Sequence, residues 1–416
     1  MTTTAPIAPP NVGDDPPSRM PPAQSRATLV GGVLAVFLVV LAATDQGSST
    51  VVKALLGLAL GVTLFHSRFG FTSAWRQLVA VGQGRALQAH MLMLVIAVIG
   101  FTVLIANGSG LFDTEPRGYV APITLGLLIG SFLFGLGMQL GGSCASGTLY
   151  ATGSGHIGVL VTLTGFVAGS GIGVANAGFW SGDGAGFVKL ADPFSFTADI
   201  GTVSGTVVLV ALLGLIAVAA ELVIRRRRPP ALDTPPVAVG AARFLRGAWP
   251  IWVGAVLLGA LNVLVLAVSG RPWGVTSAFR LWASKVLDGV GVDVASWAYW
   301  DGRAGLDTGL LTDTTTVLNV GIIIGALAAS ASAGSFALVR KVPGRQIAAG
   351  LIGGALMGYG AAFAFGCNIG AYFSGIASGS LHGWVWAVFA LVGTWVGLKV
   401  RPLFGLSVPR PTDAVC

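Results

Sequence analysis

The segment FGFTSAWR at residues 69–76 recurs as WGVTSAFR at residues 273–280, so that Thr276 follows Thr72 by 204 residues. Both copies read aromatic-Gly-x-Thr-Ser-Ala-aromatic-Arg. A match of this length indicates an internal repeat better than it fits a chance similarity. The chain is therefore expected to consist of two related halves.

A second pair of matching segments contains two of the three cysteines. GGSCASG occupies residues 141–147 and FGCNIG occupies residues 365–370, and a Gly-x-Gly pattern ends seven residues before each cysteine. Cys367 follows Cys144 by 223 residues, an offset larger than that of the first pair. The second half is therefore expected to carry an insertion between its two motifs.

The composition indicates a membrane protein. Hydrophobic residues make up 54% of the 416 residues and charged residues only 10%, against roughly 45–50% and ~25% in soluble domains. The 62 glycines favour closely packed transmembrane helices. The net charge of +8 lies in short clusters between apolar runs, which the positive-inside rule explains. We therefore expect a lipid bilayer as partner and no nucleic acid.

Ten apolar segments are long enough to span a bilayer, for which about 20 residues are needed. The first copy of the repeat begins at the second span and the second copy at the seventh, so an odd number of crossings inverts the second copy. We predict an all-α polytopic membrane protein, an inverted-repeat, hourglass-like bundle of about ten transmembrane helices plus four re-entrant half-helices. The predicted spans lie near residues 28–44, 49–65, 89–106, 120–139, 157–175, 204–224, 249–268, 316–338, 346–365 and 383–400.

The run Arg225–Arg228 after the sixth span predicts a cytosolic end there, and counting spans in both directions places both chain termini in the cytosol. Cys416 ends a polar tail and is expected to be incidental. The predicted division is a disordered cytosolic tail at 1–27, an extra transmembrane helix at 28–48, the first half of a transport domain at 49–224, a cytosolic basic linker at 225–248, the inverted second half at 249–402 and a cytosolic tail at 403–416.

The four motif segments are too short or too rich in glycine to span, and irregular backbone at membrane depth is tolerated where it lines a cavity. Half-helix N-termini pointing at the centre would offer N–H groups and partial positive charge to an anion. A thiol there adds a weak donor and a polarizable sulfur, which suits a ligand that itself carries sulfur. The alternative is that Cys144 and Cys367 are packing residues.

The other motif side chains have two interpretations each. The arginines either compensate anionic charge in vestibules or anchor their motif helix through carbonyls at its C-terminal end, and we favour the second. The hydroxyls either line the path or cap the half-helices, and capping is favoured. His156 and His382 either relay protons or meet the membrane interface, which is the usual role at the start of a span. The predicted pathway or vestibule residues are Thr72, Ser73, Arg76, Thr276, Ser277 and Arg280.

With these motifs the chain resembles the YeeE/YedE family of sulphur-transport membrane proteins over about residues 49 to 401. The resemblance implies an hourglass-shaped protein of the bacterial cytoplasmic (inner) membrane that takes up thiosulfate or related sulfur and selenium compounds. Family members with a further cysteine in the first motif differ from this chain at residues 68–72, which implies a shorter cysteine relay here. The predicted substrate-binding residues are Cys144, Cys367, Ser143, Asn368, Gly142, Gly366, Gly147 and Gly370.

We therefore predict a permease for thiosulfate or a similar small inorganic sulfur anion, with no enzymatic activity, cofactor or metal. The alternatives are a sulfurtransferase or redox protein with a covalently modified cysteine, a transporter of selenium compounds, and a channel or scaffold. An activated thiolate needs a nearby base, and neither cysteine has a charged neighbour in the sequence. A cytosolic sulfur-carrier or sulfurtransferase protein is a further expected partner.

Overall fold

The computed structural model describes residues 21–45, 47–182, 184–229, 240–338 and 342–408. Ten candidate membrane spans lie within this part of the chain, which confirms the predicted number and the all-helical class. Cys416 and much of the predicted tails and linker lie outside the described residues. The long helices of the spans are α1 (Ser25–Asp45), α2 (Ser48–Ser67), α4 (Arg85–Asn107), α5 (Leu125–Leu140), α7 (Ile157–Ala175), α10 (Thr202–Arg227), α11 (Ile251–Ser269), α13 (Thr314–Ser332), α14 (Gly344–Phe363) and α16 (Leu381–Val400).

Shorter helices coincide with the four motif segments. The 11 residues of α3 and the 9 of α6 extend about 17 Å and 14 Å, well below the ~30 Å of a hydrocarbon core. The segment after Cys367 begins as a π-helix and continues as an α-helix. These helices are α3 (Phe71–Val81), α12 (Thr276–Gly289), α6 (Ala145–Gly153), η3 (Asn368–Phe373) and α15 (Ser374–Ala377).

The remaining elements are short and connect the long helices. Two strands pair antiparallel, with Ile123 opposite Ala191. A hydrogen-bonded bridge also joins Ser195 to Ser380. These elements are β1 (Ile123–Thr124), β2 (Lys189–Ala191), α8 (Ala177–Trp180), α9 (Phe196–Asp199), η1 (Gly240–Phe244), η2 (Leu310–Thr312) and η4 (Arg401–Phe404).

The core of the bundle is built from pairs of closely packed helices. The helix pairs with the most extensive contacts are α7 with α14, α2 with α13, and α5 with α16. Glycine makes this possible: a Cβ at Gly61 would collide with the carbonyl of Ile322, and one at Gly135 with the carbonyl of Ala390. Small residues at such crossings let helix backbones approach within van der Waals contact.

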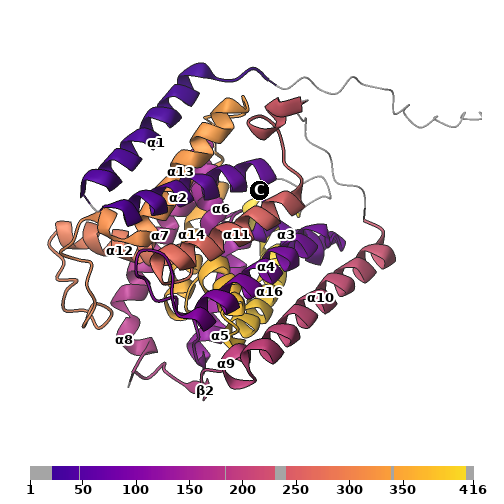
Figure 1. Cartoon of the computed structure of the whole chain (residues 1–416), viewed down its shortest axis with the longest axis vertical. Helices are drawn as coiled ribbons and strands as arrows, with labels where there is room; N and C mark the ends of the chain where they lie inside the picture. Colours follow the sequence, from indigo (N-terminus) through magenta and orange to yellow (C-terminus); the bar gives the residue numbers. More distant parts are fainter. Residues whose placement is uncertain (1–20, 46, 183, 230–239, 339–341, 409–416) are drawn as a thin grey trace, which may run out of the picture.

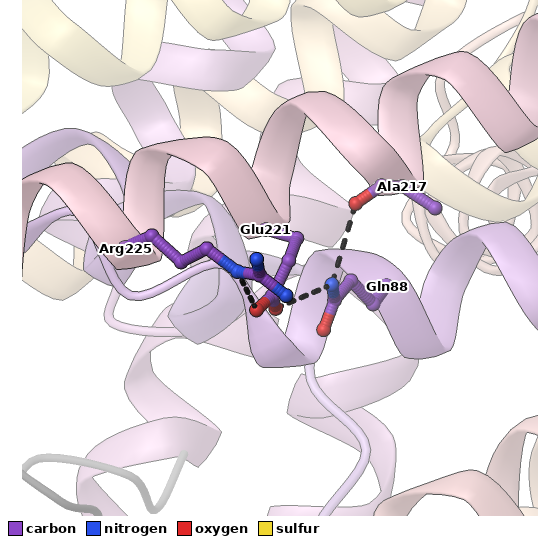
Figure 2. A network of polar contacts seen from close by, with 4 residues as sticks. All are labelled: Gln88, Ala217, Glu221 and Arg225. Atoms are coloured by element: carbon purple, nitrogen blue, oxygen red, sulfur yellow. Dashed lines mark hydrogen bonds and ion pairs between the residues drawn. The ribbon is translucent and has the colours of Figure 1, made fainter.

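Two spans lie at the periphery. Only 17% of the most apolar stretch of α1 and of α10 is buried, against 44–61% in the other spans, and Figure 1 shows these helices at different flanks of the bundle. On α10, Glu221 accepts a hydrogen bond from Arg225 and another from Gln88 of α4 (Figure 2). Gln88 also donates to the carbonyl of Ala217, so this network fixes α10 against α4.

Candidate functional site

The two motif cysteines are buried in the same hydrophobic cluster. Cys144 immediately precedes α6 and is 2% exposed, and Cys367 immediately precedes η3 and is fully buried. Both have extended backbone. The fold therefore brings together two residues that the sequence places 223 positions apart.

Each thiol has its own polar contact. The Cys144 Sγ lies 3.6 Å from the hydroxyl of Ser146, and the Cys367 Sγ accepts a hydrogen bond from the Ile369 N–H at 3.4 Å. Two positions before each cysteine the backbone is left-handed, with φ of 77° at Gly142 and 61° at Phe365. The chain thus approaches both cysteines through the same sharp change of direction.

Buried polar groups without a hydrogen-bond partner lie beside both cysteines. Asn368 is fully buried and neither its amide nitrogen nor its oxygen has a partner within the described residues, and the same holds for the hydroxyl of Ser143. A buried group left unsatisfied costs about 1–3 kcal/mol. Such groups normally bond to a ligand or an ordered water, so both side chains are available to a polar ligand at the thiols.

Gly147 places the first turn of α6 directly against this polar group. A Cβ at Gly147 would collide with the Ser143 hydroxyl and would stand 3.5 Å from the Cys144 Sγ. Gly366, with φ of 130°, occupies a backbone conformation that other residues rarely adopt. These glycines are required by the shape of the cysteine segments.

The first motif helix is not capped in the predicted way. The residue before α3 is Gly70, and no side chain caps it. Ser73 donates instead to the Gly70 carbonyl at 3.1 Å. Thr72 is fully buried with an unpartnered hydroxyl, and Arg76 is buried with an unpartnered Nε, within the residues described.

The second motif helix departs from the prediction in the same way. Val275 precedes α12 and, being apolar, supplies no cap. Ser277 donates at 3.0 Å to Thr315 of α13, and Thr276 is buried. The capping prediction is wrong in both halves because the hydroxyls bond to other partners or face the interior.

Two arginines bond the C-terminal ends of the helices that lead into the cysteine segments. Arg280 Nη1 donates to the carbonyl of Ala362 in α14 at 3.4 Å, and Arg401 Nη1 donates to the carbonyl of Gln139 in α5. Ala362 and Gln139 each lie five residues before a cysteine. The predicted anchoring of α12 by Arg280 at its own end is wrong, because the contact is to a neighbouring helix. Sequence reasoning gave Arg401 no part in the site.

A basic and aromatic cluster lies beside the Cys367 segment. The guanidinium carbons of Arg280 and Arg303 stand 5.3 Å and 4.6 Å from the centre of the Tyr299 ring. Tyr119 donates to the Phe365 carbonyl at 2.9 Å, and burial raises the pKa of Tyr119 to about 12. The loop residues Tyr119, Tyr299 and Arg303 were not found by sequence reasoning, since they belong to no repeated motif.

The two histidines predicted from the sequence, His156 and His382, differ in exposure. His156 is exposed at the start of α7, in line with an interfacial position. His382 is fully buried, its Nδ1 lies 2.7 Å from the Ser380 hydroxyl, and its ring is 5.3 Å from that of Tyr119. His382 lies at the start of α16, as predicted, but its side chain is buried within the protein, so its interfacial position stays a prediction.

A further histidine was missed. His90 of α4 is fully buried, with ring centroids of Phe69 and Phe71 at 4.8 Å and 4.5 Å. Neither ring nitrogen has a partner among the residues described. A single titratable residue within a strongly apolar span is the sequence signal that points to it.

A continuous band of aromatic rings joins the two motif helices through the centre of the bundle. Trp75 of α3 is 6.1 Å from Trp386, which is 5.4 Å from Phe134. Phe134 is 5.9 Å from Phe166, which is 4.9 Å from Phe279 of α12. These rings belong to the same buried cluster as the two cysteines. The described residues hold no group of three or more metal-ligating side chains.

Comparison with known proteins matches this arrangement to a family. A family model described as sulphur transport matches residues 66–396. The chain is 27% identical over 361 residues to the thiosulfate transporter TsuA of Escherichia coli, covering 84% of this chain and 94% of that protein. It is 29% identical over 363 residues to the thiosulfate transporter TsuA of Spirochaeta thermophila, covering 82% and 96%.

A further relative matches a smaller part of the chain. The probable transporter YedE of Escherichia coli is 30% identical over 162 residues, which cover 38% of this chain and 40% of that protein. Because the family model covers well over half of the chain, the protein belongs to the sulphur transport family, also named YeeE/YedE, as its motifs suggested.

Proposed function

We propose that this chain is a permease for thiosulfate or a similar small sulfur-containing anion, which passes between Cys144 and Cys367. The observation that carries the proposal is the unpartnered polar groups of Ser143 and Asn368 beside the two buried thiols. An anion entering this region loses its hydration, so it needs donors there. The amide of Asn368, the hydroxyl of Ser143 and the S–H groups are such donors.

The thiols suit transport better than tight binding. An S–H group is a weak donor and sulfur is polarizable, so a terminal sulfur of the anion can exchange one weak contact for the next. Conduction requires sites that bind strongly enough for entry and weakly enough for release. Sulfate has no terminal sulfur to make these contacts, which is how the pair of cysteines would favour a sulfur-terminated anion.

The proposed architecture is an inverted repeat in which residues 49–224 and 249–402 are the two halves. It is supported by equivalent packing in both halves: α2 with α13 corresponds to α11 with α4, and α7 with α14 corresponds to α16 with α5. The motif helices follow the same rule, since α3 contacts α16 and α12 contacts α7. The left-handed residues at equivalent positions before the two cysteines support it further.

In this proposal the short helices α3, α6, α12 and η3 with α15 act as re-entrant half-helices around the site. Thr72, Ser73, Arg76, Thr276, Ser277 and Arg280 line the approaches to it. The protein acts in the bacterial cytoplasmic membrane with both termini in the cytosol, where a sulfur-carrier or sulfurtransferase protein receives the anion. Partial positive charge at the half-helix N-termini adds to the attraction of an anion.

The test is growth of a sulfur-auxotrophic bacterium on thiosulfate, comparing the wild type with Cys144→Ala and Cys367→Ala. Each substitution removes one hydrogen bond to the charged anion, which contributes ~1.5–3 kcal/mol. The uptake rate is therefore expected to fall roughly 10- to 150-fold. Ser131→Ala is the matched control, because it also removes one buried polar atom, at a hydroxyl bonded within α5. Membrane abundance of every variant is measured in parallel.

Each outcome has a definite meaning. Uptake that requires both cysteines but not the Ser131 hydroxyl supports the proposal, whereas equal uptake by all variants would reduce the cysteines to packing residues. A persulfide detected by mass spectrometry on Cys144 or Cys367 would favour a sulfurtransferase or redox protein. Growth on selenium compounds but not on thiosulfate would identify the protein as a transporter of selenium compounds.

A further inference from the structure

We propose that Arg68 holds a small inorganic anion in a second site, a cavity at the end of α2 that is separate from the two thiols. The inference rests on the proposed function for its role in transport: the cavity is where the anion pauses at the cytosolic mouth. The binding site itself is argued from the cavity, from the backbone of Arg68 and from the charges around it.

The cavity has a volume of about 110 Å³, which is enough for several waters or one small polyatomic anion. Four separate parts of the chain form its walls: the N-terminal segment, the end of α2, the segment before α11 and the segment after α13. The lining residues are Pro21, Phe65, Arg68, Gly247, Ala248, Ala333 and Ser335. Arg68 is thus the one charged side chain among the described residues that line the cavity.

The backbone at Arg68 argues for a role of its side chain. Arg68 ends α2 with φ of 48°, in the left-handed region where glycine is favoured. A residue with a Cβ costs about 1–2 kcal/mol there, and such strain persists mainly where the side chain is needed. Replacement by glycine would relieve this strain, so the local fold does not require an arginine.

No acidic side chain among the described residues pairs with the charge of Arg68. The guanidinium is partly buried and forms no ion pair with any described residue. A guanidinium is always charged and its planar donors match an oxyanion. Inside a partly desolvated cavity such a group attracts an anion more strongly than one in open water.

Arg228 shows what a helix-ending arginine does without a cavity. It ends α10 with φ of 44°, so the two residues share the same backbone and the same position after a long helix. Both interact favourably with the C-terminal end of a helix dipole. Arg228, however, is exposed to solvent, so hydration satisfies its charge. Arg68 and Arg228 therefore differ mainly in their surroundings, so comparing their variants tests the effect of the cavity.

The cavity lies at the far end of the helix that begins at Cys144. Helix α6, which contains Tyr150, contacts α2, the helix that ends at Arg68. Tyr150 follows Cys144 by six residues, which along an α-helix corresponds to about 9 Å. An anion leaving the thiol therefore has one short helix to pass before it reaches the guanidinium.

One wall of the cavity is fastened to α2. The N–H of Trp249 donates to the carbonyl of His66 at 2.8 Å, and the His66 Nδ1 lies 2.9 Å from the carbonyl of Gly247. The His66 and Trp249 rings are stacked at 4.9 Å. Arg246 donates to the carbonyl of Pro21, which also lines the cavity. These contacts hold the N-terminal segment, the end of α2 and the segment before α11 together around the cavity.

The test uses the purified full chain carrying Cys144→Ala and Cys367→Ala, so that binding at the thiols is removed. Isothermal titration with sodium thiosulfate is expected to detect a remaining site. Arg68→Gly in this background should weaken that binding at least tenfold, while Arg228→Gly should leave it unchanged. The described lining residues carry no sulfur atom, so sodium sulfate is expected to bind within about threefold of thiosulfate, since charge alone selects the anion.

Absence of binding in the double-cysteine variant, or equal binding by its Arg68→Gly and Arg228→Gly derivatives, overturns the inference. Thermal unfolding serves as the folding control, because glycine at position 68 is expected to preserve or raise the melting temperature. The two proposals fail separately. If anion binding depends on Arg68 but the chain transports no thiosulfate, only the proposed permease function is contradicted. If uptake depends on the cysteines but no anion binds at Arg68, only the proposed second site is contradicted.

Discussion

The segments around Cys144 and Cys367 reach similar backbone paths by different means. In the first, the left-handed residue is Gly142, and apart from its two chain neighbours no described residue has an atom within 4 Å of where its Cβ would stand. In the second, the left-handed residue is Phe365, and its carbonyl accepts a hydrogen bond from Tyr119. In the first segment the left-handed backbone is made possible by a glycine, whereas in the second it is supported by a hydrogen bond from a distant loop.

The helices that follow the cysteines differ as well. Cys144 leads into a regular α-helix, whereas Cys367 leads into a π-helical turn. π-Helical turns occur frequently at functional sites. The Cys367 segment therefore contains both the non-glycine residue with left-handed backbone and the irregular helix. It depends more on contacts with its surroundings than the Cys144 segment does. The comparison suggests that equivalent substitutions will have unequal effects.

The largest difference is expected between Gly147→Ala and Gly370→Ala. A methyl group at position 147 collides with the Ser143 hydroxyl, whereas one at position 370 meets only the Phe365 carbonyl, at 3.9 Å. Overpacking of a buried site costs about 1–3 kcal/mol, so Gly147→Ala should lower both thermal stability and thiosulfate uptake, while Gly370→Ala should remain near wild type. Equal losses in both variants would show that the segments are equivalent after all.

A smaller effect is expected when the left-handed glycine is replaced. Gly142→Ala has open space around its methyl group, so its cost is that of the left-handed backbone alone, about 1–2 kcal/mol. Gly32→Ala in α1 is the matched control, since its surroundings are equally open and its backbone is helical. Thermal unfolding in detergent measures both. A tolerated alanine at position 142 would contradict the role assigned to the turn.

The smallest effect is expected when the hydrogen bond from Tyr119 to the Cys367 segment is removed. Tyr119→Phe removes one hydrogen bond and should lower the free energy of unfolding by about 1 kcal/mol at neutral pH. Tyr299→Phe is the control, because no hydrogen bond of its hydroxyl is observed in the described residues, and it should change little. Loss of uptake without loss of stability would indicate a direct role for Tyr119 in the pathway.

The contribution of Tyr119 should also depend on pH in one direction. The hydroxyl donates only when protonated, and its pKa is raised to about 12 from an ordinary value near 10. The folded state then holds the proton more tightly, so the contribution is complete below about pH 10 and is lost as pH rises toward 12. The stability difference between wild type and Tyr119→Phe should be constant from pH 6 to 9. A difference that disappears within that range would contradict the observed hydrogen bond.

Much of the fold could be predicted from the chain alone. The ten spans were predicted because each is a long apolar run, and length and apolarity are local properties. The short motif helices were predicted because glycine-rich segments cannot continue a spanning helix. Capping by hydroxyls was predicted wrongly, because propensity says which residues can cap but not which partner lies nearest once α13 packs beside α12.

The candidate site was predicted only where the repeat marked it. Cys144, Cys367 and their neighbours occupy repeated positions, so the sequence by itself determined that they are the candidate site. Tyr119 and Arg401 form bonds to residues 246 and 262 positions away, and Arg68 is joined in one cavity with parts of the chain more than 170 positions away. Only the tertiary structure decides such contacts, because they arise from the packing of helices that carry no local record of their neighbours.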